Sequence, residues 1–454
     1  GDTTVWLLDD GRRPEMKELA DYYGIKYVTR DNNLHAKAGN INAALPLFKG
    51  DLILIVDADH VPAPDFLEAT TGYFADLEVA LVQTAHSFRN HNSVAHSTQG
   101  RNEQSLFFDV LLPGRNRTKS VLWCGSAALI SREALNHVGG LSTYSITEDY
   151  ETSLNMRRAG YKVLYHNEHL VQGLAPDNLN AYVIQKHRWA QGQFMLYRPK
   201  IRLPLRKELG SVERISYFGG FLYYITPYQK ILYVINLIGV AVFGLIPVGY
   251  AGGWYLVFWG SATVLNLAAV TALERGTSHP FEGLANTFIT MEAYLRASLS
   301  LFSKKPHKFV VTPKSEVDLG GFEAVKILRL PITLAVLTFC AIAFAWFNVI
   351  TFHFFGNTDV KHLSIPTVSV ITLFGGVEIF VIIETAIKIY KRKQFRELWR
   401  FPVRLRAYVN GEIASCIDLH QHGAALITSS RIIDKDKPVQ IKVECRDVEG
   451  KTHW

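Results

Sequence analysis

The chain has 454 residues, a formal net charge of +7 at pH 7 and a composition that is 48% hydrophobic. A chain of this length is expected to fold as two or three units rather than as one compact domain. The positive charge is modest and lies beside apolar segments, which fits a membrane surface and argues against a nucleic-acid partner. The four cysteines are far apart and form no C-x-x-C pair, so neither a zinc site nor a disulfide framework is indicated.

Residues 1–205 alternate short apolar runs with amphipathic stretches. Residues 5–8 and 52–56 are apolar runs of strand length, as expected for parallel strands buried on both faces. Residues 15–23 have the spacing of a helix, and 40–48 could form a second one. This order predicts an α/β domain, in which functional groups lie just beyond the C-terminal ends of the strands. Because the chain starts directly in a strand-like run, we expect a longer protein.

The middle of the chain, 206–390, is largely apolar. Residues 281–303 mix charges into an apolar pattern, which indicates an interfacial helix. Four runs are long enough, or nearly so, to cross the hydrocarbon core of a membrane. These candidate spans are 231–248, 251–273, 330–352 and 364–387.

The basic side chains between the candidate spans predict the membrane topology. Residues 391–406 hold seven basic side chains against one acid, and the loop 274–329 is also rich in Lys and Arg. The connections near 249–253 and 353–363 are nearly free of them. The positive-inside rule then predicts four crossings with both ends and the middle loop in the cytoplasm. We expect a multi-pass protein of the inner (plasma) membrane with a cytoplasmic α/β domain.

Two acidic motifs follow predicted strands. Asp57 and Asp59 stand one residue apart after the second strand, where two carboxylates can hold a divalent cation and, through it, a diphosphate. Alone this D-x-D is weak, because about one is expected by chance in a chain of this length. With nothing else beside it, a solvated strand end would be the favoured explanation. The first strand ends in D-D-G, which includes Asp10 and also reads as an ordinary turn.

Further motifs follow in order, each with an ordinary structural alternative. Lys37 in H-A-K-A-G-N offers a cation at a helix start, which suits phosphate or a simple helix cap. Cys124 in C-G-S is less telling, because a buried cysteine beside a glycine turn usually serves packing. Asp149 in T-E-D could accept a proton from an attacking hydroxyl or cap a helix. Arg188 and Trp189 in Q-x-x-R-W suit a pyrophosphate and a sugar face, or an amphipathic helix.

Taken together and in this order, these motifs resemble those of the processive family 2 glycosyltransferases, and most of all the bacterial cellulose synthase catalytic subunits. The segment 309–314 strengthens the resemblance, because F-V-V-T-P-K fits the F-x-V-T-x-K gating loop of that family. The resemblance covers nearly the whole chain. It implies a GT-A fold, UDP-glucose as the donor, a growing glucan chain as the acceptor and Mg2+ or Mn2+ as the cofactor.

The resemblance also implies roles for individual residues. Asp149 would be the general base of an inverting displacement, and Asp59 would bind the metal that helps to stabilise the departing UDP. Arg188 would meet the diphosphate and Trp189 the acceptor glucose. The full set implied to bind donor or acceptor is Asp10, Lys37, Asp57, Cys124, Glu148, Gln185, Arg188, Trp189, Thr312 and Lys314.

The C-terminal segment 391–454 resembles the start of a PilZ domain, a small β-barrel that binds cyclic dimeric GMP (c-di-GMP). The residues that fit its R-x-x-x-R and D-x-S-x-x-G motifs are Arg400, Arg404, Asp418 and Gly423. His420 departs from the second motif by replacing the serine. The resemblance implies c-di-GMP as an activator. A basic anchor on anionic lipid is the alternative.

The predicted organisation is therefore an α/β GT-A domain over 1–205, N-terminally incomplete, a transmembrane channel region with interfacial helices and a gating loop over 206–390, and a partial PilZ-like β-barrel over 391–454. An accessory periplasmic subunit is a further expected partner. A synthase of a β-1,3 or mixed-linkage glucan, hyaluronan or chitin stays open, because such enzymes share the motifs. A transporter with a regulatory domain has no reason to carry Asp149 with Q-x-x-R-W, and a non-processive transferase needs neither Q-x-x-R-W nor a membrane bundle.

Overall fold

The computed structural model describes most of the chain. The residues it describes are 2–90, 93–96, 102–176, 178–245, 252–274, 276, 280–303, 321–355, 363–391, 401–409, 412–420, 423–428, 441–446 and 452–453. They fall largely into two compact units, the first reaching Lys393 and the second running from Gln394 to Trp454. The expected gating loop, with Thr312 and Lys314, and Arg400 lie outside the described residues.

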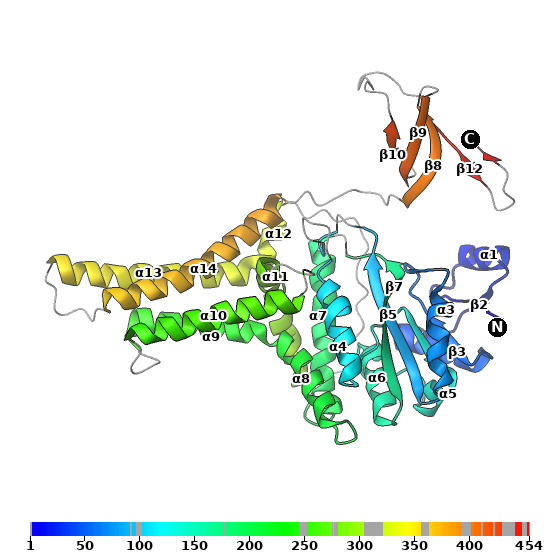
Figure 1. Cartoon of the computed structure of the whole chain (residues 1–454), viewed down its shortest axis with the longest axis horizontal. Coiled ribbons are helices and arrows are strands. Elements are labelled where there is room, and N and C mark those ends of the chain that lie inside the picture. Colours follow the sequence, from blue (N-terminus) through cyan, green and yellow to red (C-terminus); the bar gives the residue numbers. More distant parts are fainter. Residues whose placement is uncertain are drawn as a thin grey trace. The chain divides into compact units, whose positions relative to one another are not determined.

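A five-stranded sheet forms the core of the α/β part of the first unit (Figure 1). The strands, in the order in which they lie side by side, are β3 (Leu52–Ile55), β6 (Ala128–Ser131), β5 (Val79–Phe88), β7 (Lys162–Gly173) and β4 (Val61–Pro62). The sheet is mixed, because β5 and β7 pair in parallel whereas β3 and β6 are antiparallel. The prediction of a parallel, fully buried strand at 52–56 is therefore wrong. As an edge strand, β3 has a neighbour on one side, and three of its four residues are partly exposed.

The first predicted strand lies outside this sheet. β1 (Trp6–Leu8) pairs in parallel with β2 (Lys26–Val28), a strand that was not predicted, and α1 (Pro14–Tyr22) connects them. α2 (Ala36–Ala44) begins before the predicted helix at 40–48 and continues into the 3-10 turn η1 (Leu45–Leu47).

Short helices complete the α/β domain. They are α3 (Phe66–Thr71), η2 (Gly72–Ala75), η3 (Phe107–Leu111), α4 (Leu112–Arg117), α5 (Arg132–His137), α6 (Glu148–Arg158), η4 (Leu203–Leu205) and the longer α7 (Leu179–Leu196). The main hydrophobic core combines side chains of α2, α5 and α6 with those of β3, β5, β6 and β7. This core fixes the loops at the ends of β3 and β6 and the first turns of α2 and α6, which carry the predicted motifs.

The apolar part of the chain is helical. Its elements are α8 (Ser211–Tyr224), α9 (Thr226–Phe243), α10 (Gly252–Glu274), α11 (Pro280–Ser298), η5 (Leu299–Leu301), α12 (Gly321–Val325), η6 (Lys326–Leu328), α13 (Arg329–Phe355) and α14 (Ile365–Lys391). Within the described residues, three helical segments are long and apolar enough to cross a membrane: Thr226–Phe243, Lys326–Phe355 and Ile365–Tyr390. α13 packs against both α9 and α14, and Figure 1 shows α13 and α14 side by side.

The predicted spans differ from these helices in detail. α9 begins and ends five residues before the run predicted at 231–248, because Pro227 suits a helix start and Gly244 adopts the left-handed conformation that ends a helix. α10 occupies the span predicted at 251–273 as a helix of 23 residues, and its crossing of a membrane stays a prediction. Most of the run predicted at 281–303 is helical, as α11, which packs against α7; its position at a membrane interface stays a prediction.

The second unit contains a four-stranded antiparallel sheet in the order β10-β9-β8-β11. Its strands are β8 (Phe401–Val409), β9 (Glu412–His420), β10 (Gly423–Thr428) and β11 (Ile441–Val443), and β12 (Cys445–Arg446) pairs separately with β13 (Thr452–His453). The described strands of this unit form β-sheet, and the PilZ-like barrel stays a prediction. Arg404 lies in β8, Asp418 in β9 and Gly423 at the start of β10.

Candidate functional site

Lys37 joins two of the predicted motifs. It lies in the first turn of α2, and its ammonium group forms an ion pair with the Asp57 carboxylate. The same ammonium donates a hydrogen bond of 2.5 Å to the carbonyl of Gly125, and the Asp57 backbone N–H donates to Ser126 Oγ over 3.0 Å. Burial opposes ionisation of Asp57, but the contact with Lys37 and the smaller effects of His60 and His86 together outweigh it and lower the pKa of that carboxyl. The D-x-D loop and the C-G-S loop are thus held together.

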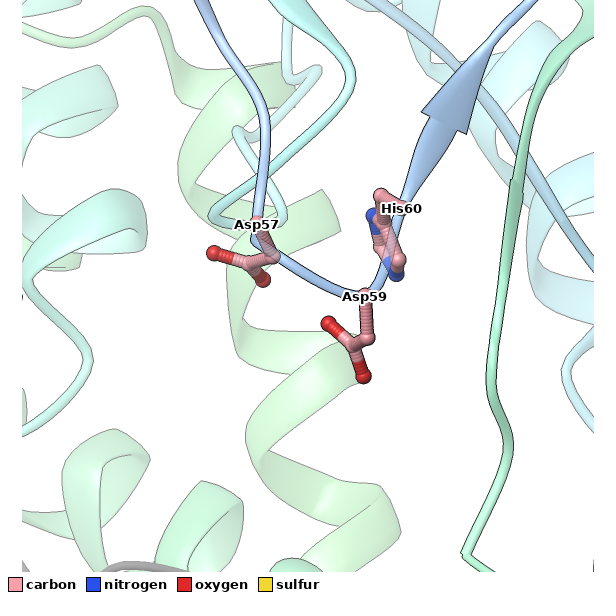
Figure 2. Close-up of side chains that lie close together, drawn as sticks. All are labelled: Asp57, Asp59 and His60. Atoms are coloured by element: carbon pink, nitrogen blue, oxygen red, sulfur yellow. The ribbon is translucent and has the colours of Figure 1, made fainter. Parts of the chain in front are cut away.

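Asp57, Asp59 and His60 form a group that could hold a metal ion. One potential ligand atom from each lies within 4.8 Å of the others, and Figure 2 shows all three side chains on the loop that leads from β3 to β4. Carboxylate oxygens and an imidazole nitrogen are suitable ligands for Mn2+, and the carboxylates alone suit Mg2+. His60 also lies 2.8 Å from Ser126 Oγ through Nδ1. The sequence analysis missed His60, although its position directly after D-x-D was a usable signal.

Two carboxylates stand at the start of α6. Glu148 and Asp149 are the first two residues of that helix, and the Tyr150 N–H donates to Asp149 Oδ1 over 2.8 Å. The surrounding protein disfavours the charged form, and the neighbouring Glu148 adds like-charge repulsion, so the pKa of Asp149 is raised to about 7. Burial likewise raises the pKa of Glu148. Asp149 therefore has the proton affinity of a general base that works near neutral pH.

The Q-x-x-R-W motif on α7 reaches the same carboxylates. Burial lowers the pKa of Arg188, and the charges of Glu148, Asp149 and Asp57 act against that effect. Arg188 is thus within electrostatic range of both acidic motifs. We call these two cations and three acids the charged cluster (Lys37, Asp57, Glu148, Asp149 and Arg188).

Two uncharged predicted residues lie near the charged cluster, Cys124 beside Asp149 and Gln185 about one helical turn before Arg188 on α7. Burial, and then the charge of Asp149, raise the pKa of the Cys124 thiol well above its usual value, so Cys124 is a neutral neighbour of the candidate base. Gln185 has a buried Oε1 that accepts no hydrogen bond from the described residues. A buried amide oxygen without a donor is costly, and a hydroxyl of a bound ligand would satisfy it.

A buried glutamine holds the C-G-S loop in place. Gln83, in the interior of β5, donates from Nε2 to the Ser126 carbonyl over 3.0 Å and accepts from the Cys124 N–H over 2.8 Å. His86 Nε2 lies 3.1 Å from the same Ser126 carbonyl. These polar residues were missed by the sequence analysis. The signal was their position inside an otherwise apolar strand that reads V-A-L-V-Q-T-A-H.

Asp10 is held by an arginine that the sequence motifs did not include. Arg30 donates two hydrogen bonds of 2.7 Å to the Asp10 carboxylate, and also bonds the carbonyls of Leu34 and Ala36. Asp10 is therefore attached to the loop before α2. Its predicted contact with a nucleotide stays a prediction, and Arg30 is a residue that the sequence analysis missed.

The backbone of Gly125 approaches the candidate base closely. Gly125 adopts a left-handed φ of 87°, and a Cβ added there would lie 2.8 Å from Asp149 Oδ2. A larger residue would therefore displace the Asp149 carboxylate or the loop that bonds Lys37.

Replacing Gly125 with alanine tests this approach. We expect Gly125→Ala to lower the free energy of unfolding by about 2 kcal/mol more than Gly139→Ala does. Both substitutions place an alanine in a left-handed backbone conformation, but the added Cβ collides with Asp149 at position 125 and with no atom at position 139. Gly139 is a matched control, with a φ of 84° and no atom within 4 Å of an added Cβ. Thermal unfolding of the detergent-solubilised protein measures the difference. Equal losses for the two variants would contradict the close approach.

Comparison with known proteins identifies the domain that carries this site. Residues 9–192 match the family described as "Glycosyltransferase like family 2". A cellulose synthase catalytic subunit (UDP-forming) from Xanthomonas axonopodis pv. citri is 39% identical over 51% of this chain and 32% of its own length. The subunit of the same name from Pseudomonas fluorescens is 35% identical over 53% of this chain and 33% of its own length.

The chain spans about a third of the length of these curated relatives. Among solved structures, a mannosyltransferase from Pyrobaculum calidifontis in complex with GDP-Man and Mn2+ aligns with 66% of this chain and 79% of its own, at 20% identity and a TM-score of 0.44. That likeness is too weak to carry an argument. The family match, the sequence identity to the curated relatives and the mixed α/β sheet agree with the predicted GT-A domain. Residues 9–192 are therefore a family 2 glycosyltransferase domain.

Proposed function

We propose that this protein is a processive, inverting glycosyltransferase that polymerises glucose from UDP-glucose into a β-glucan, in the first place cellulose. The observation that carries the proposal is the charged cluster, in which Asp149 has a pKa raised to about 7 beside two cations. A base and diphosphate-binding cations in one place are what a displacement of UDP by a sugar hydroxyl requires. The curated relatives are named as UDP-forming cellulose synthase catalytic subunits, which supports UDP as the leaving group and cellulose as the product.

Asp149 is proposed to remove the proton of the acceptor hydroxyl. A carboxylate of ordinary pKa would be a weak base, whereas one with a pKa of about 7 is both partly ionised and basic at neutral pH. Arg188 and Lys37 are proposed to offset the negative charge of the diphosphate as UDP departs, Arg188 by a bidentate contact. Because Arg188 is partly withdrawn from water, its charge acts more strongly there than at the surface.

A divalent cation is proposed to bind at Asp59, with Asp57 and His60 as neighbouring ligands. The donor set fits Mn2+ or Mg2+, since it offers two carboxylates and one imidazole. When bound, the cation supplies positive charge to the diphosphate. Lys37 holds Asp57 in its ionised form, ready for this contact.

The acceptor is proposed to lie on the other side of Asp149. Trp189 would stack on the terminal glucose, Gln185 would accept a sugar hydroxyl at its unpaired Oε1, and Cys124 would border the sugar. Asp10, attached to Arg30, would approach the nucleotide. Thr312 and Lys314, outside the described residues, would close over UDP as a gating loop.

The apolar helices are proposed to form the path for the polymer through the inner membrane, with the transferase domain in the cytoplasm. Three helices of sufficient length and the basic segment 391–406 support this orientation. Membrane lipids, the growing glucan and an accessory periplasmic subunit would then be its partners.

Linkage analysis tests the proposed function. Membranes that contain the protein would be given radiolabelled UDP-glucose, UDP-N-acetylglucosamine and UDP-glucuronic acid, singly and in pairs. We expect a polymer from UDP-glucose alone, with β-1,4 linkages, that is absent from membranes carrying Arg188→Met. A β-1,3 or mixed-linkage product, or incorporation of the other sugars, would show that the polymer is another β-linked polysaccharide and not cellulose. No polymer from any donor would contradict the proposal.

A second proposal concerns regulation by c-di-GMP through Arg400, Arg404, Asp418 and Gly423. Its support is the register of the sheet, in which Pro402, between the two arginines, lies opposite Asp418, and Gly423 pairs with His420. The two motif segments are thus neighbours on adjacent strands. Arginines suit the phosphates and the guanine faces of the dinucleotide.

Titration of c-di-GMP against the full-length protein by calorimetry tests the second proposal. We expect binding and a rise in polymer synthesis, and we expect Arg404→Ala to weaken the binding by at least about tenfold, since charge-assisted contacts to phosphate are lost. Lys442→Ala, which removes an exposed cation from β11 of the same sheet, is the control and should bind normally. Absence of both heat and activation would leave the basic segment as a lipid anchor.

A further inference from the structure

One face of α7 carries a buried cation between two aromatic rings. Tyr182, Lys186 and Trp189 are spaced four and three residues apart and therefore share this face. The Lys186 ammonium lies 4.5 Å from the centre of the Trp189 ring and 5.3 Å from that of the Tyr182 ring. Both distances are within the range of cation–π attraction.

An acid from a distant segment fixes this cation. Glu103 forms an ion pair with Lys186, and the Tyr182 hydroxyl donates a hydrogen bond to the same carboxylate. The side chains of Lys186 and Glu103 are 7% and 11% exposed. Removing one partner of such a pair is strongly destabilising, because the other charge stays buried alone. The ammonium is therefore confined to one position.

The position of Lys186 constrains the indole of Trp189. A cation over the ring attracts it and occupies one of its two faces. Any sugar that stacks on Trp189 must then use the opposite face. A fixed indole also loses less conformational freedom when a ligand binds than a mobile one does. Lys186, fixed by Glu103, can therefore hold the Trp189 indole in the orientation needed for stacking before a sugar binds.

We propose that Lys186 and Glu103 form a positioning pair that orients Trp189 for the terminal sugar of the acceptor chain. The inference rests on the proposed function, because it requires Trp189 to bind the acceptor. Neither member of the pair is proposed to touch the donor or the reacting atoms. Their effect should therefore appear in acceptor binding and in the partition between transfer and hydrolysis, and not in donor binding.

The test uses the full-length protein and the double variant Lys186→Met with Glu103→Gln. Removing both charges together avoids a buried unpaired charge, and both replacements nearly keep the side-chain size. Cellopentaose binding is measured by calorimetry, and UDP-glucose binding is measured in the same way. In membranes, polymer synthesis and UDP-glucose hydrolysis are measured side by side. Lys186→Arg tests for rescue, because it keeps the cation and the ion pair.

We expect the double variant to bind cellopentaose about tenfold more weakly and to raise the ratio of hydrolysis to transfer about tenfold, while binding UDP-glucose within about twofold of wild type. Lys186→Arg should bind cellopentaose nearly as strongly as wild type and should keep the ratio of hydrolysis to transfer near the wild-type value. The matched control is Lys162→Met with Asp76→Asn, an ion pair whose side chains are 41% and 45% exposed, and it should change nothing.

Two results would overturn the positioning role. One is cellopentaose binding by the double variant at wild-type strength. The other is an equal loss of cellopentaose and UDP-glucose binding, which would indicate general damage to the fold. Polymer synthesis by the wild type tests the proposed function separately. A wild-type protein that binds cellopentaose through Lys186 and Glu103 without making polymer would keep the positioning pair and refute the synthase.

Discussion

Lys37 is bonded at once to the Asp57 carboxylate and to the Gly125 carbonyl, and the geometry of the site depends on this double contact. The contact joins the start of α2, the loop after β3 and the loop before β6. Gly125 in turn lies against Asp149 so closely that a Cβ has no room. A displacement of Lys37 would therefore reach the candidate metal group on one side and the candidate base on the other.

Burial is the main reason that the pKa of Asp149 is raised, and the charge of Glu148 adds to it. Lys37 and Arg188 act against this rise but do not cancel it, so the pKa of Asp149 lies at about 7 instead of its ordinary 3.8. Because the folded state holds this proton more tightly than the unfolded state, the contribution of Asp149 to stability falls as the pH rises from about 4 to about 7. A bound diphosphate would change this balance, since it adds further negative charge.

Most motifs of the site could be predicted from the sequence, because D-x-D follows a strand and T-E-D and Q-x-x-R-W lie on helices, whereas C-G-S lies in the loop before β6. The structure brings Asp57, Cys124, Asp149 and Arg188 into one region. The direction of β3 could not be predicted, since it is set by pairing with β6, more than 70 residues later. Arg30, Gln83 and Glu103, which hold site residues in place, could not be predicted for the same reason. Each is a common residue whose meaning depends on a partner remote in the chain.

Asp149 as the base of a sugar transfer is tested by comparing Asp149→Asn with wild type in full-length protein. We expect UDP binding of nearly wild-type strength and a loss of chain extension by at least about a thousandfold, because the amide cannot take the proton. We also expect the wild-type rate to fall as the pH drops below about 7, where Asp149 becomes protonated. Chain extension by Asp149→Asn within about tenfold of wild type would show that Asp149 is not the base.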